Sequence, residues 1–267
     1  MQQEHRQPHN RPHNSEHQVA QNRATPHRAT QHQSAQNRTR RVEFLYEDRD
    51  LIAIEKPAGL AVIAGPGSRE KTAYDLVSAH IQHNNPHGRA ALVHRLDRDT
   101  SGVMIFAKNP RAKKALMDNW NELVKERVYV ALIEGEFDAD AGTYDTWLAE
   151  NRAGTVYETE PGAPGSLRAV THWRRLASST PRLASFPRYT LLELSLETGR
   201  KHQIRAQLAA AHHPVAGDHR YGARTDPFGR LCLHAKLIVV EHPFTHELLK
   251  FESKEPEFFW QDMDSRR

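Results

Sequence analysis

His94-Arg95-Leu96-Asp97-Arg98-Asp99-Thr100-Ser101-Gly102 is a polar stretch that runs directly into the apolar residues 103–107, Val-Met-Ile-Phe-Ala. The apolar run predicts a buried strand. The acidic segment should then lie at the edge of that strand, where a rigid backbone can aim a side chain into a cleft. Asp97 is the candidate functional residue, because the arginines at i−2 and i+1 favour its ionised form.

The end of the same segment has the composition of a turn. Asp99, Thr100 and Ser101 have short polar side chains that bond their own backbone, and Gly102 accepts positive φ. Close Arg–Asp pairs are also frequently structural. Spacing alone therefore leaves open whether Asp97 carries chemistry or only stabilises a turn.

The string HRLDRDTSG resembles the HRLDxxTSG signature of the RluA-like family of RNA pseudouridine synthases, whose signature aspartate is catalytic. Further family-like segments follow in chain order, and the resemblance covers about residues 42 to 260. They are the opening hairpin at 46–54, the turn at 55–60, the strand segment at 127–131, TGRKHQIR at 198–205, LCLHA at 231–235 and KEPEF at 254–258. The turn at 55–60 departs from the family pattern, because Glu55 replaces the usual Asn.

The resemblance implies three catalytic residues. Asp97 is the catalytic carboxylate, Tyr129 supplies a ring that stacks on the target base, and Arg205 pairs with Asp97 when the site is empty. Leu233 lies near the family's apolar wall for the base. Taken without the resemblance, Tyr129 would be a core aromatic of a strand with its hydroxyl at the rim.

Basic residues near these positions are candidates for RNA binding. Arg95 either contacts RNA or braces the loop that carries Asp97. If residues 200–212 are helical, Lys201 and Arg205 stand one turn apart, a like-charge spacing that costs a few tenths of a kcal/mol unless an anion or solvent relieves it. We therefore expect Arg200 or Lys201 to meet a phosphate, with simple solvation as the alternative.

The resemblance implies an RNA pseudouridine synthase that isomerises uridines in ribosomal or transfer RNA with the target base flipped out. It implies no metal and no cofactor. RNA is the expected partner, no obligatory protein partner is indicated, and a monomer is expected. Two alternatives stay open: a noncatalytic RNA-binding or assembly protein on the same fold, and a glycosidase-like hydrolase that pairs Asp97 with Asp99.

Composition is consistent with a soluble cytoplasmic enzyme. The 267 residues, 38% of them hydrophobic, can bury a sizeable core in one or two domains. The single Cys232 excludes an internal disulfide framework, and its apolar surroundings suggest a small core residue. No apolar stretch reaches membrane-spanning length, and the N-terminus lacks the apolar core of a secretory signal.

Residues 1–41 differ sharply from the rest of the chain. They carry seven Arg and two Glu, a net charge of +5, which leaves −1 for the remainder of a chain whose net charge is +4. With Val19 as the only large aliphatic residue, this His/Gln/Arg-rich basic tail should be disordered. It could attract RNA phosphates without sequence preference, or, through its six histidines, bind a metal; a solvated tail is the simpler interpretation.

The remaining residues, 42–267, predict one mixed α/β domain. Strands are expected at 42–46, 51–54, 103–107, 128–133, 189–196 and 231–240, helices at 72–82, 109–124 and 200–212, and a loop or insertion at 150–169. Asn109 and Pro110 suit the cap and first position of the second helix. The family resemblance adds an α+β class: a central, mainly antiparallel sheet flanked by helices, with an active-site cleft.

Overall fold

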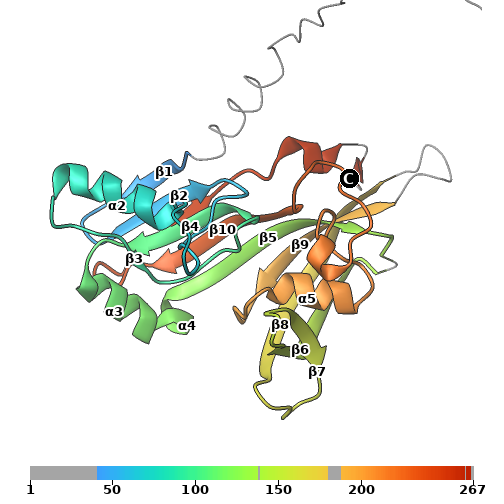
Figure 1. The fold of residues 1–267 in the computed structure, drawn as a ribbon. Coiled ribbons are helices and arrows are strands. Elements are labelled where there is room, and N and C mark those ends of the chain that lie inside the picture. The colour runs from blue at the N-terminus through green and yellow to red at the C-terminus, as the bar shows by residue number, and fades with distance from the viewer. Residues whose placement is uncertain (1–40, 138, 180–187, 262, 266–267) are drawn as a thin grey trace, which may run out of the picture. The chain divides into compact units, whose positions relative to one another are not determined.

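The computed structural model describes residues 41–137, 139–179, 188–261 and 263–265. Nearly all of the predicted tail lies outside these ranges. Within them, the fold has the expected α+β class, with one large mixed sheet and few helices (Figure 1). None of the helices in the described ranges has the length and apolar character needed to cross a membrane.

The sheet has the strand order β1-β2-β4-β10-β5-β9-β8-β6-β7, and β3, β11 and β12 pair at its margins with β4, β10 and β8. The strands are β1 (Glu43–Glu47), β2 (Leu51–Lys56), β3 (Ala91–Leu92), β4 (Ser101–Ala107), β5 (Val124–Glu134), β6 (Ala141–Glu150), β7 (Val156–Thr159), β8 (Leu167–Ser179), β9 (Tyr189–Leu196), β10 (Leu233–Glu241), β11 (Leu248–Glu252) and β12 (Met263–Ser265). Among the pairs described, only β4 and β10 run parallel.

The helices are short. They are α2 (Ala73–Asn84), α3 (Pro110–Asp118), α4 (Trp120–Leu123) and α5 (Gln203–Ala210), with 3-10 turns at His219–Tyr221 and Glu257–Trp260. The cap of α2 is reciprocal, because Thr72 accepts from the Asp75 backbone N–H while Asp75 accepts from the Thr72 N–H. Asn109 caps α3 by accepting from the Ala112 N–H at 2.8 Å, as its sequence predicts.

Alternation along the central strands decides which helix covers which face. On β2, Ile52 and Ile54 belong to a core cluster with Val77 of α2, whereas Leu51 and Ala53 belong to another cluster with Leu116 of α3. The two helices therefore cover opposite faces of the β2–β4 part of the sheet. A third cluster lies between α5 and strands β5 and β9.

Several boundaries differ from the sequence prediction. The helix expected at 109–124 ends at Asp118, where Asn119 leaves helical geometry, and Val124 already begins β5. The region 150–169 is not a plain loop, because β7 and the start of β8 lie in it and both pair with β6. The helix expected at 200–212 begins only at Gln203.

Candidate active site

Asp97 lies on a short turn that leads into β4. The Thr100 N–H donates to the Asp97 carbonyl at 3.3 Å, and Ser101 and Gly102 are already part of the strand. The prediction that residues 99–102 form a turn is thus wrong for Ser101 and Gly102, which belong to β4. Gly102 has φ +112°, and a Cβ there would lie 2.1 Å from the Ala235 carbonyl oxygen of β10. The glycine is required by this close approach as well as by its backbone angle.

Two buried contacts hold the Asp97 segment in place. The Lys56 ammonium, fully buried, donates to the Arg98 carbonyl at 2.8 Å and to two carbonyls of its own turn, Pro57 and Leu60. Burial lowers the pKa of Lys56 to about 7, against the opposing charges of Asp99 and Asp97. On the other side, the ring of His94 accepts from the Ile105 N–H at 3.0 Å.

His94 is therefore a structural residue in this geometry. Burial lowers its pKa to about 3, and the nearby Arg127 charge acts in the same direction. A neutral ring can accept the strand N–H, whereas an imidazolium has no free lone pair to do so. The hydrogen bond from Ile105 ties the signature segment to the middle of β4.

The arginines that flank Asp97 in sequence are not its partners. Arg98 is exposed and pairs with Glu70, and exposed Arg95 has no hydrogen bond or ion pair within the described ranges. The expected long-range pair is present instead: Nη1 of Arg205 lies 3.0 Å from Oδ2 of Asp97.

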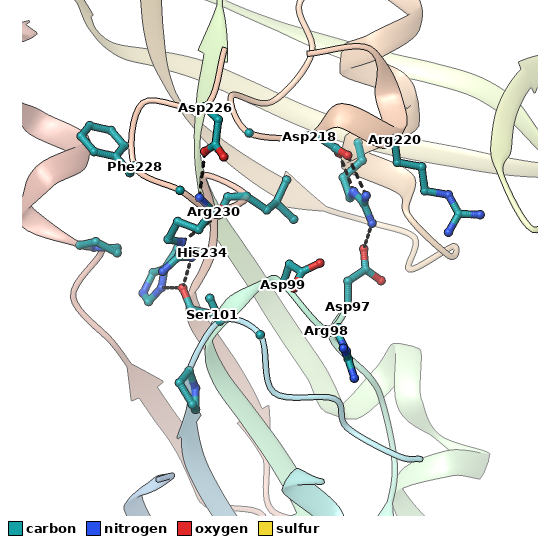
Figure 2. Close-up of a pocket in the computed structure, with 18 of the residues that line it drawn as sticks. Asp97, Arg98, Asp99, Ser101, Asp218, Arg220, Asp226, Phe228, Arg230 and His234 are labelled. Carbon is teal, nitrogen blue, oxygen red and sulfur yellow. Dashed lines mark hydrogen bonds and ion pairs between the residues drawn. The ribbon is translucent and has the colours of Figure 1, made fainter. Parts of the chain in front are cut away.

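Arg205 is itself fixed from behind by Asp218. Its Nε and Nη2 donate to the two Asp218 oxygens at 2.6 and 2.8 Å, a bidentate arrangement that leaves Nη1 for Asp97. Burial alone would lower the pKa of Arg205, but Asp218 and Asp97 outweigh it and raise that pKa. Figure 2 shows the Asp97 and Asp218 carboxylates on opposite sides of this one guanidinium group.

The imidazole ring of His202 faces the other oxygen of Asp97. Nε2 of His202 lies 3.6 Å from Asp97 Oδ1, and Nδ1 of the same ring lies 2.8 Å from the Tyr221 hydroxyl. Burial lowers the pKa of His202; Asp97 opposes this shift, while the positive charges of Arg205, Arg220 and Lys201 add to it.

A small cavity with one apolar side adjoins the carboxylate. It has a volume of about 60 Å³, and its lining includes Tyr129, Leu233, Ile204 and Leu96. Tyr129 is half-buried on β5, and burial raises its pKa to about 12, with the Asp97 charge adding to the effect and Arg127 opposing it. The sequence-predicted Tyr129, Leu233 and Arg205 thus all line the same cavity as Asp97.

A larger cleft of about 1170 Å³ also has Asp97 in its lining (Figure 2). Its walls carry Arg230, Arg220 and Lys254, while Phe228 adds an aromatic ring. Arg230 donates to the Ser101 hydroxyl at 2.8 Å and thereby connects the cleft wall to the start of β4. A third hollow, of about 340 Å³, also reaches Asp97 and holds Arg95 and Arg127 in its lining.

Arg200 and Lys201 lie beside the site but do not form the expected helical pair with Arg205. Both precede α5, so the like-charge spacing of one helical turn does not exist. Arg200 donates to the Arg168 carbonyl at 3.0 Å, and exposed Lys201 pairs with Glu150. Both side chains line the third hollow, within reach of a ligand at Asp97.

Sequence reasoning missed Asp218, His202 and Tyr221. The signal was weak: residues 217–222 read GDHRYG, two glycines around a short polar run, which is ordinary turn composition. Only the tertiary structure brings this run against α5. Within the described ranges, no cluster of three or more His, Cys, Asp or Glu side chains could hold a metal ion.

Comparison with known proteins identifies the class that this fold and this site define. Residues 50–210 match the family model described as RNA pseudouridylate synthase. An RNA pseudouridine synthase of Bacillus subtilis (strain 168), YhcT, described as uncharacterised, is 35% identical over 215 residues, which are 80% of this chain and 69% of the relative. Ribosomal large subunit pseudouridine synthase D of Haemophilus influenzae is 34% identical and covers 82% of this chain and 68% of its own length.

A solved structure shares the fold. Human RNA pseudouridylate synthase domain containing 4 superposes with a TM-score of 0.65 at 23% identity, over 88% of this chain and 97% of that chain. The chain belongs to the RluA-like family of RNA pseudouridine synthases. It is thus an RNA-modifying isomerase.

Proposed function

We propose that this protein converts specific uridines of ribosomal or transfer RNA into pseudouridine, and that Asp97 is the catalytic carboxylate. The observation that carries the proposal is the position of Asp97, which lines the large cleft, the third hollow and the small cavity, with one oxygen on Arg205. The bidentate hold of Asp218 on Arg205 supports it, because a cation fixed in this way orients the carboxylate that it pairs with.

The reaction explains why one carboxylate is sufficient. The bond from C1′ to N1 of the uridine breaks, the uracil turns, a bond from C1′ to C5 forms, and the hydrogen on C5 leaves as a proton while N1 gains one. Asp97 either attacks as a nucleophile or removes a sugar proton in an elimination. Both routes begin at the same ionised oxygen and need no net redox change.

The base must leave its stack to reach Asp97. Unstacking costs a few kcal/mol, which stacking on an aromatic ring can offset. We propose that Tyr129 supplies this ring and that Leu233 forms the apolar wall opposite. Their shared cavity beside the carboxylate supports these roles.

We propose that Arg95, Arg200 and Lys201 bind the RNA around the flipped uridine. The support is strongest for Arg95. This exposed residue lines the large cleft, the small cavity and the third hollow, and it has no hydrogen-bond or ion-pair partner within the described part of the chain. Lys201 would exchange its exposed pair with Glu150 for a phosphate, an exchange that costs little because exposed ion pairs contribute about 0 to 1 kcal/mol.

Ribosomal RNA is the first substrate to test, since the Haemophilus relative is named for the large ribosomal subunit. We also propose that the protein acts in the cytoplasm, as a monomer and without an obligatory protein partner, as its composition suggests. The decisive experiment maps pseudouridines in total RNA from cells with and without the gene. The loss of at least one site in ribosomal or transfer RNA is expected; an unchanged map contradicts the proposal.

The hydrolase alternative has less support. Asp99 lies beside Asp97 on the same turn (Figure 2). Two carboxylates that cleave a glycosidic bond by acid–base chemistry must flank that bond. Release of free uracil from RNA would revive this alternative.

The first prediction concerns the Asp97→Asn variant. Amide substitution keeps the shape but removes the ionised oxygen, so pseudouridine formation should fall by about three orders of magnitude or more. Tritium release from RNA labelled at uridine C5 measures this rate, because C5 loses its hydrogen in the reaction. Asp99→Asn is the matched control and should keep activity within about tenfold if Asp99 only holds the turn.

A further inference from the structure

His202 contacts the proposed catalytic carboxylate from the side that Arg205 leaves free. Its backbone is left-handed, with φ 50°, and it directly precedes α5. Such an angle is uncommon for a residue other than glycine. The turn at 200–203 uses it to point the ring at both Asp97 and Tyr221.

The hydrogen bonds of Tyr221 determine which ring nitrogen of His202 carries the proton. The Val156 backbone N–H donates to the Tyr221 oxygen at 3.1 Å, which uses that oxygen as an acceptor. The hydroxyl has one hydrogen to donate. Nδ1 of His202, at 2.8 Å, is the acceptor that the described residues offer it. In the neutral ring this leaves the proton on Nε2, the nitrogen that faces Asp97 Oδ1.

We propose that His202, held in its neutral Nε2–H form by Tyr221, is a positioning residue for Asp97. Its N–H donates to Oδ1 while Arg205 holds Oδ2, so the carboxylate plane is fixed by two donors on two oxygens. The proposal rests on the proposed catalytic role of Asp97. No proton is transferred to or from His202.

The distance from Nε2 to Oδ1, 3.6 Å, suits a contact that tightens when RNA fills the cleft, since hydrogen bonds of catalytic groups are often long in empty sites. The surroundings favour a neutral ring, because Arg205, Arg220 and Lys201 already face it with positive charge. A neutral donor orients the carboxylate without a second full positive charge, which would weaken it as a nucleophile or base.

One short segment supplies both supports. Asp218 holds Arg205 and Tyr221 holds His202, and the Tyr221 ring also lies under the Arg205 guanidinium, with 4.8 Å from Cζ to the ring centroid. A three-residue 3-10 turn, His219–Tyr221, directly follows Asp218 and so sets the spacing between the two supports.

Two substitutions of His202 separate positioning from a purely structural role. Asn suits left-handed backbone but is too short to reach Asp97, whereas Gln suits that backbone less and places an amide N–H near the Nε2 position. A structural role predicts that Asn is the better replacement. Positioning predicts the reverse: a loss of about 100-fold in the single-turnover rate for His202→Asn and substantial recovery for His202→Gln.

The substrate is ribosomal RNA that carries tritium at uridine C5. It is isolated from cells that lack the gene, so its target uridine is still unmodified. Tyr221→Phe should lower the single-turnover rate about tenfold with RNA affinity unchanged, because His202 loses the hydroxyl that sets its tautomer and so no longer orients Asp97. The same substitution removes the acceptor of the Val156 N–H, which lies away from Asp97. Tyr46→Phe is the matched control: it also removes a tyrosine hydrogen bond, to Asp48 at 2.7 Å, but in β1, and should keep the wild-type rate.

Nitrogen NMR of histidine-labelled protein tests the tautomer without RNA. In the wild type, Nε2 of His202 should be protonated and Nδ1 unprotonated; in Tyr221→Phe this preference should be lost. A wild-type rate in Tyr221→Phe, His202→Asn at least as active as His202→Gln, or an Nδ1–H ring would each overturn the proposal. An active Asp97→Asn would instead overturn the proposed function.

Discussion

Lys56 shows how a single residue joins the folding of this protein to its site. It is among the largest fully buried side chains in the described structure, and its ammonium donates to three backbone carbonyls, one of them in the Asp97 turn. Lysine is almost never fully buried without such partners. From the sequence alone, Lys56 was only part of a family-like turn.

The second prediction is the pH dependence that this burial produces. The pKa of Lys56 is lowered to about 7, so between pH 7 and about 10 the unfolded chain binds a proton that the folded chain has lost. Its contribution to the free energy of unfolding therefore rises with pH in this window, by up to about 1 kcal/mol per pH unit, and is constant below it.

Urea unfolding at pH 7, 8 and 9 measures this contribution when the wild type is compared with Lys56→Met. The difference between their free energies of unfolding, wild type minus variant, should increase with pH. The Cys232 thiol makes the free energy of unfolding fall with pH, but only above about pH 9, because burial raises its pKa from 9 to about 12. A difference that stays flat would mean that Lys56 remains charged in the folded protein.

At the scale of elements, the parallel contact between β4 and β10 builds the site. His234 and Ala235 pair with Ser101 and Gly102, so the strand that follows Asp97 meets the strand that begins with Leu233. The two strands are more than a hundred residues apart in sequence. Their close approach is possible because Gly102 has no side chain.

The third prediction is that Gly102→Ala destabilises the fold by at least about 3 kcal/mol, since its Cβ would collide with a β10 carbonyl. Gly59→Ala is the matched control. Gly59 also has positive φ, +80°, but nothing lies within 4 Å of its Cβ position, so only the backbone cost of about 1 kcal/mol is expected. Denaturant unfolding of both variants measures the loss in the free energy of unfolding. Equal losses would show that the positive φ, and not the collision with β10, determines the destabilisation.

Elements with strong local signals were predicted well. Apolar alternation and caps are local properties, so β2, β9, the core of β10 and the N-terminus of α3 fall where the sequence indicates. The strands β6, β7 and β8 were missed, because the glycines and prolines at 154–165 have the composition of a loop. In the structure, β6 pairs with both β7 and β8, so this region forms part of the sheet. The start of α5 was misplaced because left-handed His202 has no sequence signal.

At the scale of the whole molecule, the expected role of the basic tail rests on its composition and charge alone. Residues 1–41 carry seven of the arginines and leave the remainder of the chain at a net charge near zero. The fourth prediction is that removal of this tail lowers RNA affinity and makes its salt dependence shallower by about one unit or more in log–log slope. Filter binding over a range of salt concentrations tests it; an unchanged slope would exclude the tail from RNA binding.

The sequence by itself determined the family and the α+β class. A nine-residue signature and several ordered motifs suffice for this, because motifs record residue types in chain order. The sequence also named Asp97, Tyr129, Arg205 and Leu233, which the structure brings to one cavity.

Only the tertiary structure decided how Asp97 is held. Arg98, its sequence neighbour, pairs with Glu70 instead. The contacts of Asp97 come from Arg205 of α5 and from His202 just before α5, and Asp218 and Tyr221 hold these two residues in turn. Hydrogen bonds depend on distance and angle in space, which sequence separation does not encode. The HRLDRDTSG segment therefore places Asp97 in the sequence, and the fold brings Arg205 and His202 to its two carboxylate oxygens.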